Sequence, residues 1–314
     1  MVDWTNPAAG AFWHDWKRQP LVEAGVVGHW TDLGEPEMFD PNAWYAGLTG
    51  DYAPLNRQAD VHNLYNLLWS ESIFDGYQRN GVTQRPFILS RSGAPGSQRY
   101  GVAMWSGDIG ANLSSLASHL NVQMQMSFSG MDYFGSDIGG FHRGGLDGDL
   151  DEMYTRWFAV SRLIDLPVRA HTEHLCNCKE TAPDRIGDLP SNLANIRLRY
   201  ALSPYLYSLS QRAYLAGEPV FPPLVYYYQA DPQVRELGDQ KLLGRDLLAA
   251  FSTTYGEQAR PIYLPEGTWY DFHTLERYTS TGETFGPFSL FPDGRYRLPL
   301  FARAGALIPL MPVD

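Results

Sequence analysis

Short apolar runs alternate with longer amphipathic segments through the first two-thirds of the chain. The apolar runs occupy residues 26–32, 85–91, 131–137 and 166–171, with a fifth candidate at 219–224. Between them, apolar side chains recur at near-helical spacing over residues 62–79, 153–164 and 191–216. Strands that alternate with helices predict β-α units and therefore a parallel sheet.

An ionisable residue closes each of the first four runs. These residues are Asp32, Arg91, Asp137 and His171. In a (β/α)8 barrel, catalytic groups lie at the C-terminal ends of the strands and converge on one mouth, whereas a doubly wound sheet brings fewer strand ends together. The pattern therefore predicts an α/β fold of the TIM-barrel type. Five strands do not close an eight-stranded barrel, so either some strands escape the pattern or the chain begins partway around it.

The pattern changes after about residue 228, where short alternating segments are separated by proline and glycine turns. The segments are 260–264, 267–271, 298–301 and 306–309. Such alternation is typical of antiparallel strands in a sandwich. We therefore predict two domains: residues 1–228 form part of an α/β barrel, and residues 229–314 form a small all-β sandwich, whole or in part.

Composition and charge exclude several classes of function. Of the 314 residues, 44% are hydrophobic and 19% are charged, which is typical of a globular protein and not of a disordered one. The net charge of −11 argues against nucleic acid or an anionic membrane surface as a partner, because both attract basic proteins. The chain has no apolar run of the roughly 18–20 residues that a spanning helix needs, and its N-terminus lacks a signal-peptide pattern. We therefore expect a cytoplasmic protein.

Two compositional features bear on ligands. The 9 Trp, 19 Tyr and 15 Phe residues suit stacking on sugar rings, but they equally suit a large aromatic core. Cys176 and Cys178 are the only cysteines, and with no second pair and only His171 and His174 nearby they are too few to predict a metal site. We expect neither a metal nor a cofactor.

The acidic side chains at the strand ends are candidates for glycoside chemistry. Hydrolysis with retention needs two carboxyl groups roughly 5–5.5 Å apart, one ionised to attack and one protonated to assist departure. Asp32 ends the first run, and Glu35 and Glu37 follow in the next loop, so any of the three could attack. Structural roles fit as well, because Asp32 could cap a helix that begins near Pro41 and Glu35 could form an ion pair.

Two further acids and a histidine belong to the later runs and loops. Asp108 ends a Trp-Ser-Gly-Asp sequence that begins at Trp105. An aromatic wall favours the protonated form of a neighbouring carboxyl, which a proton donor needs. Asp137 lies in a glycine-rich stretch, where a capped turn is the alternative. His171 follows Arg169 and could bind a hydroxyl group, although a lone histidine is more often a structural residue.

These motifs, in this order and at about these spacings, resemble glycoside hydrolase family 31. The likeness rests on Trp30-Thr31-Asp32 with Glu35-Pro36, on Ser90-Arg91-Ser92 with Gly96-Ser97-Gln98-Arg99-Tyr100, on Trp105-x-Gly107-Asp108, and on Gly135-x-Asp137-Ile138-Gly139-Gly140-Phe141. It continues through Arg169-x-His171 and residues 199–207 into the sandwich, at Gly267-x-Trp269-Tyr270-Asp271 and Phe301-x-Arg303-x-Gly305. The likeness thus covers essentially the whole chain.

The resemblance implies a retaining exo-α-glycosidase that hydrolyses oligosaccharides or small α-glycosides through a covalent glycosyl–enzyme intermediate. It implies that Asp32 is the nucleophile and Asp108 the general acid/base. The residues implied to line the pocket for the terminal sugar are Arg91, Trp105, Asp137, Phe141 and His171. α-Glucosides are the first expectation. α-Xylosides, α-galactosides, sulfoquinovosides and transglycosylation stay open, since the fold and the catalytic pair do not set the sugar.

The sequence departs from the family in two respects. The frequent family form after the nucleophile is Asp-Met-Asn-Glu, whereas here Asp32-Leu33-Gly34-Glu35 stands. Family members also carry an N-terminal β-sandwich and earlier barrel strands, so the resemblance implies a partial barrel of about strand 4 to strand 8. Alternatives are a truncated, catalytically silent fragment or carbohydrate-binding remnant, and a chain complemented by a separate polypeptide. An exposed barrel edge predicts poor folding or self-association.

Overall fold

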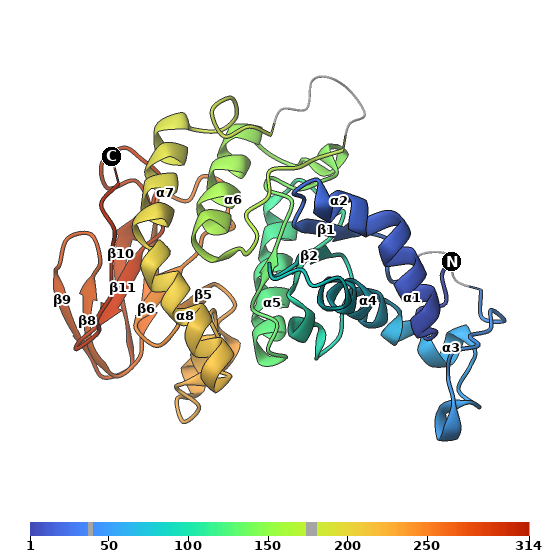
Figure 1. The fold of residues 1–314 in the computed structure, drawn as a ribbon. Coiled ribbons are helices and arrows are strands. Elements are labelled where there is room, and N and C mark those ends of the chain that lie inside the picture. Colours follow the sequence, from blue (N-terminus) through green and yellow to red (C-terminus); the bar gives the residue numbers. More distant parts are fainter. Residues whose placement is uncertain (37–39, 174–180, 314) are drawn as a thin grey trace. The chain divides into compact units, whose positions relative to one another are not determined.

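The computed structural model describes residues 1–36, 40–173 and 181–313. It divides into two compact units, Met1–Trp105 and Ser106–Asp314 (Figure 1). Four residues that the sequence raised as candidates, namely Glu37, His174, Cys176 and Cys178, lie outside the described residues.

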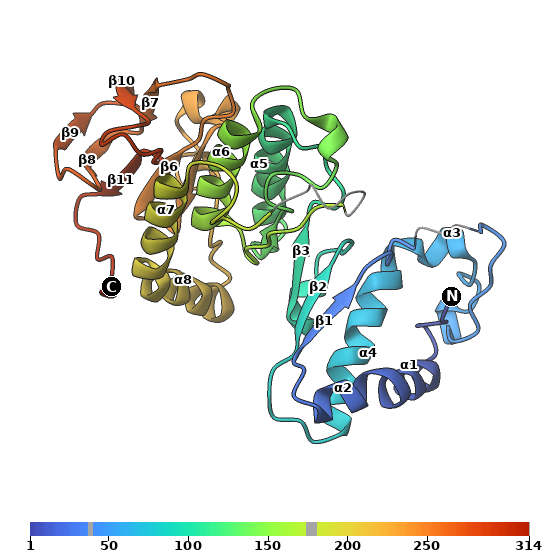
Figure 2. The ribbon, with the colours of Figure 1, turned by 90° about the horizontal axis from the view of Figure 1, so that it is seen from above.

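Three parallel strands form the sheet of the first unit (Figure 2). They are β1 (Gly28–Thr31), β2 (Phe87–Ser90) and β3 (Val102–Trp105). Thr31 pairs with Ser90, and Ser90 pairs with Met104, so the three strands end within one residue of each other. The strands predicted over 26–32 and 85–91 are confirmed at their centres. The pattern does not reveal β3, because its four residues follow a glycine- and serine-rich loop that hides so short an apolar run.

The long helix of the first unit is α4 (Tyr65–Arg79), which lies beside β1 (Figure 2). A 3-10 turn at His62–Leu64 precedes it, and together they confirm the helix predicted over 62–79. The unit also contains α1 (Pro7–Trp13), a π-helical stretch at His14–Arg18, α2 (Gln19–Glu23) and α3 (Gln58–Val61). A hydrophobic cluster of Trp4, Tyr45, Val61 and Tyr65 packs these N-terminal segments against α4.

The first part of the second unit is helical. Its elements are α5 (Leu113–Phe128), the short strand β4 (Phe134–Gly135), α6 (Leu150–Ile164), α7 (Leu189–Ala201) and α8 (Ser203–Ala216). Side-chain oxygens of Asn112, Asp149 and Asp188 cap the first turns of α5, α6 and α7. The helix predicted over 153–164 is confirmed as α6. Helix α5 escapes the sequence pattern because serine, histidine, asparagine and glutamine interrupt its apolar stripe.

The single helix predicted over 191–216 is wrong, because two helices occupy this segment. Helix α7 ends at Ala201 and α8 begins at Ser203, with the buried Leu202 at the junction. Pro204 accounts for the break, since proline has no N–H to continue the ladder and its ring crowds the carbonyl four residues earlier.

Two of the predicted strands do not form in the described structure. The run 166–171 makes only an isolated bridge between Arg169 and Asp137, and the run 219–224 makes only one between Pro223 and Lys241. Both runs contain proline, which cannot donate a ladder hydrogen bond. The run 131–137 is confirmed only at its centre, as β4.

The remainder of the second unit is all-β, as its alternating pattern predicts. Its strands are β5 (Gln240–Leu243), β6 (Leu247–Ala250), β7 (Ala259–Leu264), β8 (Gly267–Asp271), β9 (Arg277–Ser280), β10 (Glu283–Ser289) and β11 (Leu300–Arg303). Five of them form one antiparallel sheet in the order β5-β6-β11-β8-β9, and β7 pairs with β10. The strand expected over 306–309 is absent from this described segment.

One large core joins the helices and strands of the second unit. Trp157 and Phe158 of α6 are buried with Leu116 of α5 and Leu243 of β5. A polar contact crosses the same region, because the fully buried Lys241 of β5 donates a hydrogen bond from Nζ to Oε1 of Gln123 on α5, at 3.0 Å. Burial lowers the pKa of this lysine to about 7. The all-β part is therefore tied to α5 by both apolar and polar contacts.

Candidate active site

Asp32 follows β1 directly, and the alternation of the strand sets its surroundings. Thr31 is fully buried, whereas Trp30 is 45% exposed on the other face. Oδ1 of Asp32 accepts a hydrogen bond from the backbone N–H of Leu33, at 2.9 Å. Leu33 has a φ of 58°, in the left-handed region that residues with a Cβ seldom adopt, so the chain turns sharply after the acid.

The sequence leaves two structural roles open for the acids of this loop, and the structure decides both. Described residues 40–49 form turns and a β-bridge with no helix near Pro41, so a capping role for Asp32 is wrong. Glu35 does form an ion pair, with its Oε1 2.7 Å from Nε of Arg91. Oδ1 of Asp32 lies 3.3 Å from the same nitrogen. The strand ends of β1 and β2 thus bring two carboxylates to one guanidinium.

Two tryptophans stand near these strand ends. The rings of Trp30 and Trp105 meet edge to face, with their centroids 5.7 Å apart. Trp30 is 45% exposed, whereas Trp105 is buried, with 3% of its surface exposed, so Trp30 is the exposed ring of the pair. The first unit therefore offers a carboxylate pair, a guanidinium and an aromatic wall, which are the group types that bind a sugar.

Asp108 belongs to the second unit and lies in an exposed turn. The backbone next to it is held to the glycine-rich loop around Phe141. The carbonyl of Ile109 accepts from the N–H groups of Phe141 and His142, at 2.9 and 3.1 Å, and the N–H of Ala111 donates to the carbonyl of His142 at 3.0 Å. These bonds fix Asp108 beside the segment that carries Asp137 and Phe141.

Asp137 is almost fully buried, with 1% of its surface exposed. Its Oδ1 lies 3.3 Å from Nε of Arg169, and the N–H of Ile138 donates to the Arg169 carbonyl at 3.0 Å. The chain also turns here, because the N–H of Gly140 donates to the carbonyl of Asp137 at 2.9 Å, so the glycine-rich turn of the alternative interpretation is present. A buried carboxylate beside a guanidinium is a fixed hydrogen-bonding group of the kind that reads ligand hydroxyls.

His171 lies beside Phe141, with ring centroids 5.5 Å apart. The backbone carbonyl of Phe141 accepts from the Thr172 hydroxyl at 2.7 Å and from the Glu173 N–H at 3.1 Å, which keeps the two segments together. Nδ1 of His142 lies 3.0 Å from Oε2 of Glu173. In the second unit, Asp137, Phe141 and His171 therefore come together with the Asp108 loop.

Sequence reasoning missed the buried polar residues that support the segment around Asp137. Asp165 receives hydrogen bonds from the Ser136 hydroxyl at 2.9 Å and from Nε2 of His119 at 3.1 Å, and Nε1 of Trp157 donates to the Ser136 hydroxyl at 2.9 Å. Burial alone would raise the pKa of Asp165, but His119 and the surrounding hydroxyls hold it below its ordinary value. These residues are far apart in sequence and share no motif, so no local signal could have found them.

The structure adds one observation on metal ions and one on membranes. Among the described residues, no three His, Cys, Asp or Glu side chains cluster in a way that could hold a metal ion. In the same part of the chain, no helix combines the length and apolar character needed to cross a bilayer.

Two family models together match nearly all of the chain. The model of the glycosyl hydrolases family 31 TIM-barrel domain matches residues 1–209, and the model of the glycosyl hydrolase family 31 C-terminal domain matches residues 217–308. The chain belongs to glycoside hydrolase family 31. The family resemblance read from the strand-end motifs is therefore confirmed.

Curated family 31 proteins align along most of this chain. It is 30% identical to alpha-glucosidase 2 of Bacillus thermoamyloliquefaciens over 313 residues, which is 98% of this chain and 38% of that protein. It is 29% identical to an alpha-xylosidase of Saccharolobus solfataricus over 293 residues, which is 93% of this chain and 39% of that protein. The chain thus spans less than two-fifths of the length of these relatives.

Solved family 31 structures resemble the fold closely. A dextranase of Flavobacterium johnsoniae, in complex with glucose, superposes with a TM-score of 0.84 at 28% identity. The match covers all of this chain and 38% of the dextranase chain. An alpha-xylosidase of Xanthomonas citri gives a TM-score of 0.83 at 29% identity. That match covers 99% of this chain and 34% of the xylosidase chain.

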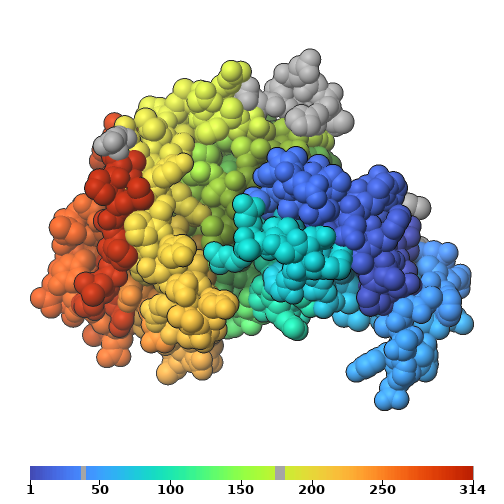
Figure 3. All heavy atoms as spheres, viewed as in Figure 1, coloured from blue at the N-terminus to red at the C-terminus, as the bar shows by residue number. Residues whose placement is uncertain are grey.

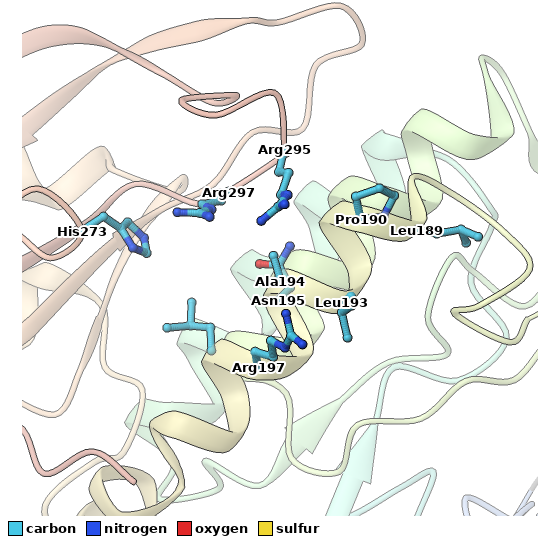
Figure 4. Close-up of a pocket in the computed structure, with 10 residues that line it drawn as sticks. Leu189, Pro190, Leu193, Ala194, Asn195, Arg197, His273, Arg295 and Arg297 are labelled. Atoms are coloured by element: carbon cyan, nitrogen blue, oxygen red, sulfur yellow. The ribbon is translucent and has the colours of Figure 1, made fainter. Parts of the chain in front are cut away.

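This family 31 chain also has a groove that none of the predicted site residues lines. It has a volume of about 530 Å³ and lies between α7 and the all-β part of the second unit (Figure 4). Leu189 and Leu193 contribute its apolar side, and His273, Arg295 and Arg297 face them. Because it holds no carboxylate, the groove lacks the groups that glycoside hydrolysis requires.

Proposed function

We propose that this chain carries the catalytic pair of a retaining exo-α-glycosidase, with Asp32 as the nucleophile and Asp108 as the general acid/base. One observation carries the proposal: Asp32 follows β1 and faces Arg91 at 3.3 Å, in a chain that matches family 31 along its length. The relatives named as alpha-glucosidase and alpha-xylosidase support terminal α-linked sugars as the substrate class. α-Glucosides are the first candidates within that class.

The proposed reaction is a double displacement. Asp32 attacks the anomeric carbon while the glycosidic C–O bond breaks, and Asp108 gives its proton to the departing oxygen. Asp108 then takes a proton from water, whose oxygen attacks the same carbon and releases Asp32. Two inversions leave the product with the α configuration of the substrate. Both reacting carboxyl groups belong to the protein, so the reaction requires no cofactor.

Five further side chains would bind the terminal sugar. Arg91, Asp137 and His171 would hydrogen-bond its hydroxyl groups, and the rings of Trp105 and Phe141 would form walls. The burial of Asp137 supports its part in this assignment, because a buried polar group left unpaired strongly disfavours a sugar that lacks the matching hydroxyl.

We further infer that residues 1–228 are the C-terminal part of a (β/α)8 barrel, from about strand 4 to strand 8. Residues 229–314 then form the following β-sandwich domain. The parallel β1-β2-β3 sheet supports the barrel assignment, and the change from the first family model to the second between residues 209 and 217 supports two domains.

Covalent labelling of the purified chain tests the nucleophile directly. A fluorinated α-glucosyl fluoride that forms the glycosyl ester but hydrolyses slowly should add one sugar mass to the chain. Peptide mass spectrometry should then locate the ester on Asp32. An ester on Glu35 would overturn the assignment, and a folded chain that no α-glycosyl probe labels would overturn the proposed function.

Turnover of aryl α-glycosides provides the complementary test. The Asp32→Ala variant should lose at least about 10³-fold in kcat, since it lacks the attacking group. Added azide should restore part of that loss and yield a β-glycosyl azide, whereas the Asp108→Ala variant with azide should yield the α-azide. The exposed acid Asp51 supplies a matched control, because Asp51→Asn should leave kcat unchanged. Equal rates in wild type and Asp32→Ala would contradict the proposed role.

A further inference from the structure

A buried amide lies beneath the ends of β1 and β2. Asn66, in the first turn of α4, is only 3% exposed. Its Oδ1 accepts a hydrogen bond from the Ser90 hydroxyl at 2.8 Å and from the Ser70 hydroxyl at 3.2 Å. Its Nδ2 makes a long hydrogen bond to Oγ1 of Thr31, at 3.5 Å. One side chain of the helix therefore contacts the last residues of two neighbouring strands.

These contacts lie one residue away from the proposed chemistry. Thr31 and Ser90 are register partners in the sheet, and both are fully buried. Asp32 and Arg91 are the next residues along their strands. Because successive side chains of a strand point to opposite faces, Thr31 and Ser90 hold the strand ends from the helix side, and the side chains that follow them lie on the opposite face.

The same amide also supports the loop after Asp32. A Cβ atom built on Gly34 would lie 2.0 Å from Nδ2 of Asn66 and 3.0 Å from its Cγ, and the first distance is too short unless the Asn66 side chain moves. Asn66 therefore occupies the space that a side chain at position 34 would need.

We propose that Asn66 is a positioning residue, which fixes Asp32 relative to Arg91 and supports the loop that carries Glu35. This inference rests on the proposed function, because it concerns the same reaction. A displacement of about 1 Å in a reacting group can cost on the order of 10²-fold in rate. Loss of the amide should therefore act on the chemical step and leave sugar binding nearly intact.

The first test separates the rate of labelling from the affinity for the probe. Asn66→Gly should lower the limiting rate constant for glycosylation of Asp32 by roughly 10- to 100-fold, with little change in the probe concentration at half-saturation. Ser70→Ala is the matched control: it removes another buried partner of Asn66 but leaves the contacts with Thr31 and Ser90. Ser70→Ala should label at the wild-type rate.

The second test exchanges the two side chains. Gly34→Asn alone should clash with Asn66 and should lower both the labelling rate and the melting temperature. In the Asn66→Gly background the same substitution has room, so the double variant should recover a large part of both losses. Additive losses in the double variant would overturn the proposal, because they would show that positions 34 and 66 do not share one space.

The outcomes keep the two proposals apart. A labelled wild type with an equally labelled Asn66→Gly variant overturns the positioning role alone. So does a loss of labelling that merely follows the melting temperature in Asn66→Gly and Ser70→Ala alike. An unlabelled, folded wild type overturns the proposed function. The melting temperatures of Gly34→Asn, alone and combined with Asn66→Gly, then still decide whether Asn66 supports the loop.

Discussion

A single guanidinium nitrogen faces two carboxylates after β1, and it cannot serve both equally. Nε of Arg91 carries one hydrogen, which it donates to Oε1 of Glu35 at 2.7 Å, while Oδ1 of Asp32 lies at 3.3 Å. Glu35 is thus the acid that anchors the guanidinium. Asp32 keeps a weaker contact and one backbone hydrogen bond, which suits a group that must approach an anomeric carbon. This division of roles supports Asp32 over Glu35 as the nucleophile.

The buried His29 of β1 predicts a dependence of stability on pH. It is 3% exposed, and its Nε2 lies 2.7 Å from the Tyr77 hydroxyl. Burial, together with the charges of Arg18 and His14, lowers the pKa of His29 to about 4. The unfolded chain binds this proton near pH 6.5, so the stability that the neutral ring contributes is complete above that pH. It is lost progressively as the pH falls from 6.5 towards 4.

The measurement is the melting temperature at pH 7 and at pH 5. We expect a smaller drop between the two pH values in His29→Gln than in wild type, because glutamine keeps a partner for Tyr77 without titrating. The half-buried His62 supplies a control, and His62→Gln should keep the wild-type drop. An unchanged drop in His29→Gln would contradict the assignment of this pH dependence to His29.

At the scale of elements, apolar spacing predicted those segments whose pattern is continuous. Helices α4 and α6 and strands β1 and β2 were all found in this way. Helix α5 was missed because polar residues that bind inside the fold, such as His119 and Gln123, resemble a solvated face when only the sequence is read. The same difference between residues with and without a local sequence pattern is found in the candidate site. Acids at strand ends were predictable, whereas Asn66 and Asp165 act through contacts between distant segments and leave no local pattern.

The glycine-rich loop after β4 packs closely against a neighbouring segment, and this packing can be tested. Gly140 has a φ of 77°, and a Cβ atom there would lie 2.5 Å from Cα of Ala111. Gly140→Ala should therefore push the loop away from the segment next to Asp108. We expect a loss of roughly 1–3 kcal/mol in unfolding free energy and a lower kcat/KM. Urea unfolding and aryl glycoside turnover measure the two effects.

Gly144, in the same loop region, is the control for that experiment. Nothing lies within 4 Å of a Cβ atom built there, so Gly144→Ala should leave both quantities near their wild-type values. If Gly140→Ala behaves like Gly144→Ala, the close approach between the loop and Ala111 does not hold Asp108 in place.

At the scale of the molecule, the surface of α7 and α8 is unusually aromatic. Tyr200, Tyr207 and Tyr214 recur every seven residues and are 56%, 70% and 84% exposed. The yellow surface in Figure 3 belongs to these two helices. Tyrosine is enriched where proteins associate, and exposed aromatic side chains favour contact with another molecule. The sequence predicted self-association through an exposed barrel edge, and these helices offer a second surface for it.

We therefore predict that the chain self-associates in a way that salt strengthens. The net charge of −11 opposes contact between copies at low ionic strength, and screening at high ionic strength removes that repulsion while the apolar contact remains. Sedimentation velocity should show a larger weight-average mass at about 0.5 M than at about 0.05 M salt, because the Debye length falls roughly threefold between these concentrations. A double substitution, Tyr207→Glu with Tyr214→Glu, should abolish the increase. Tyr52→Glu, at a tyrosine that is 68% exposed in the first unit, should not. A monomer at both salt concentrations, or a mass that falls with added salt, would show that this surface does not associate.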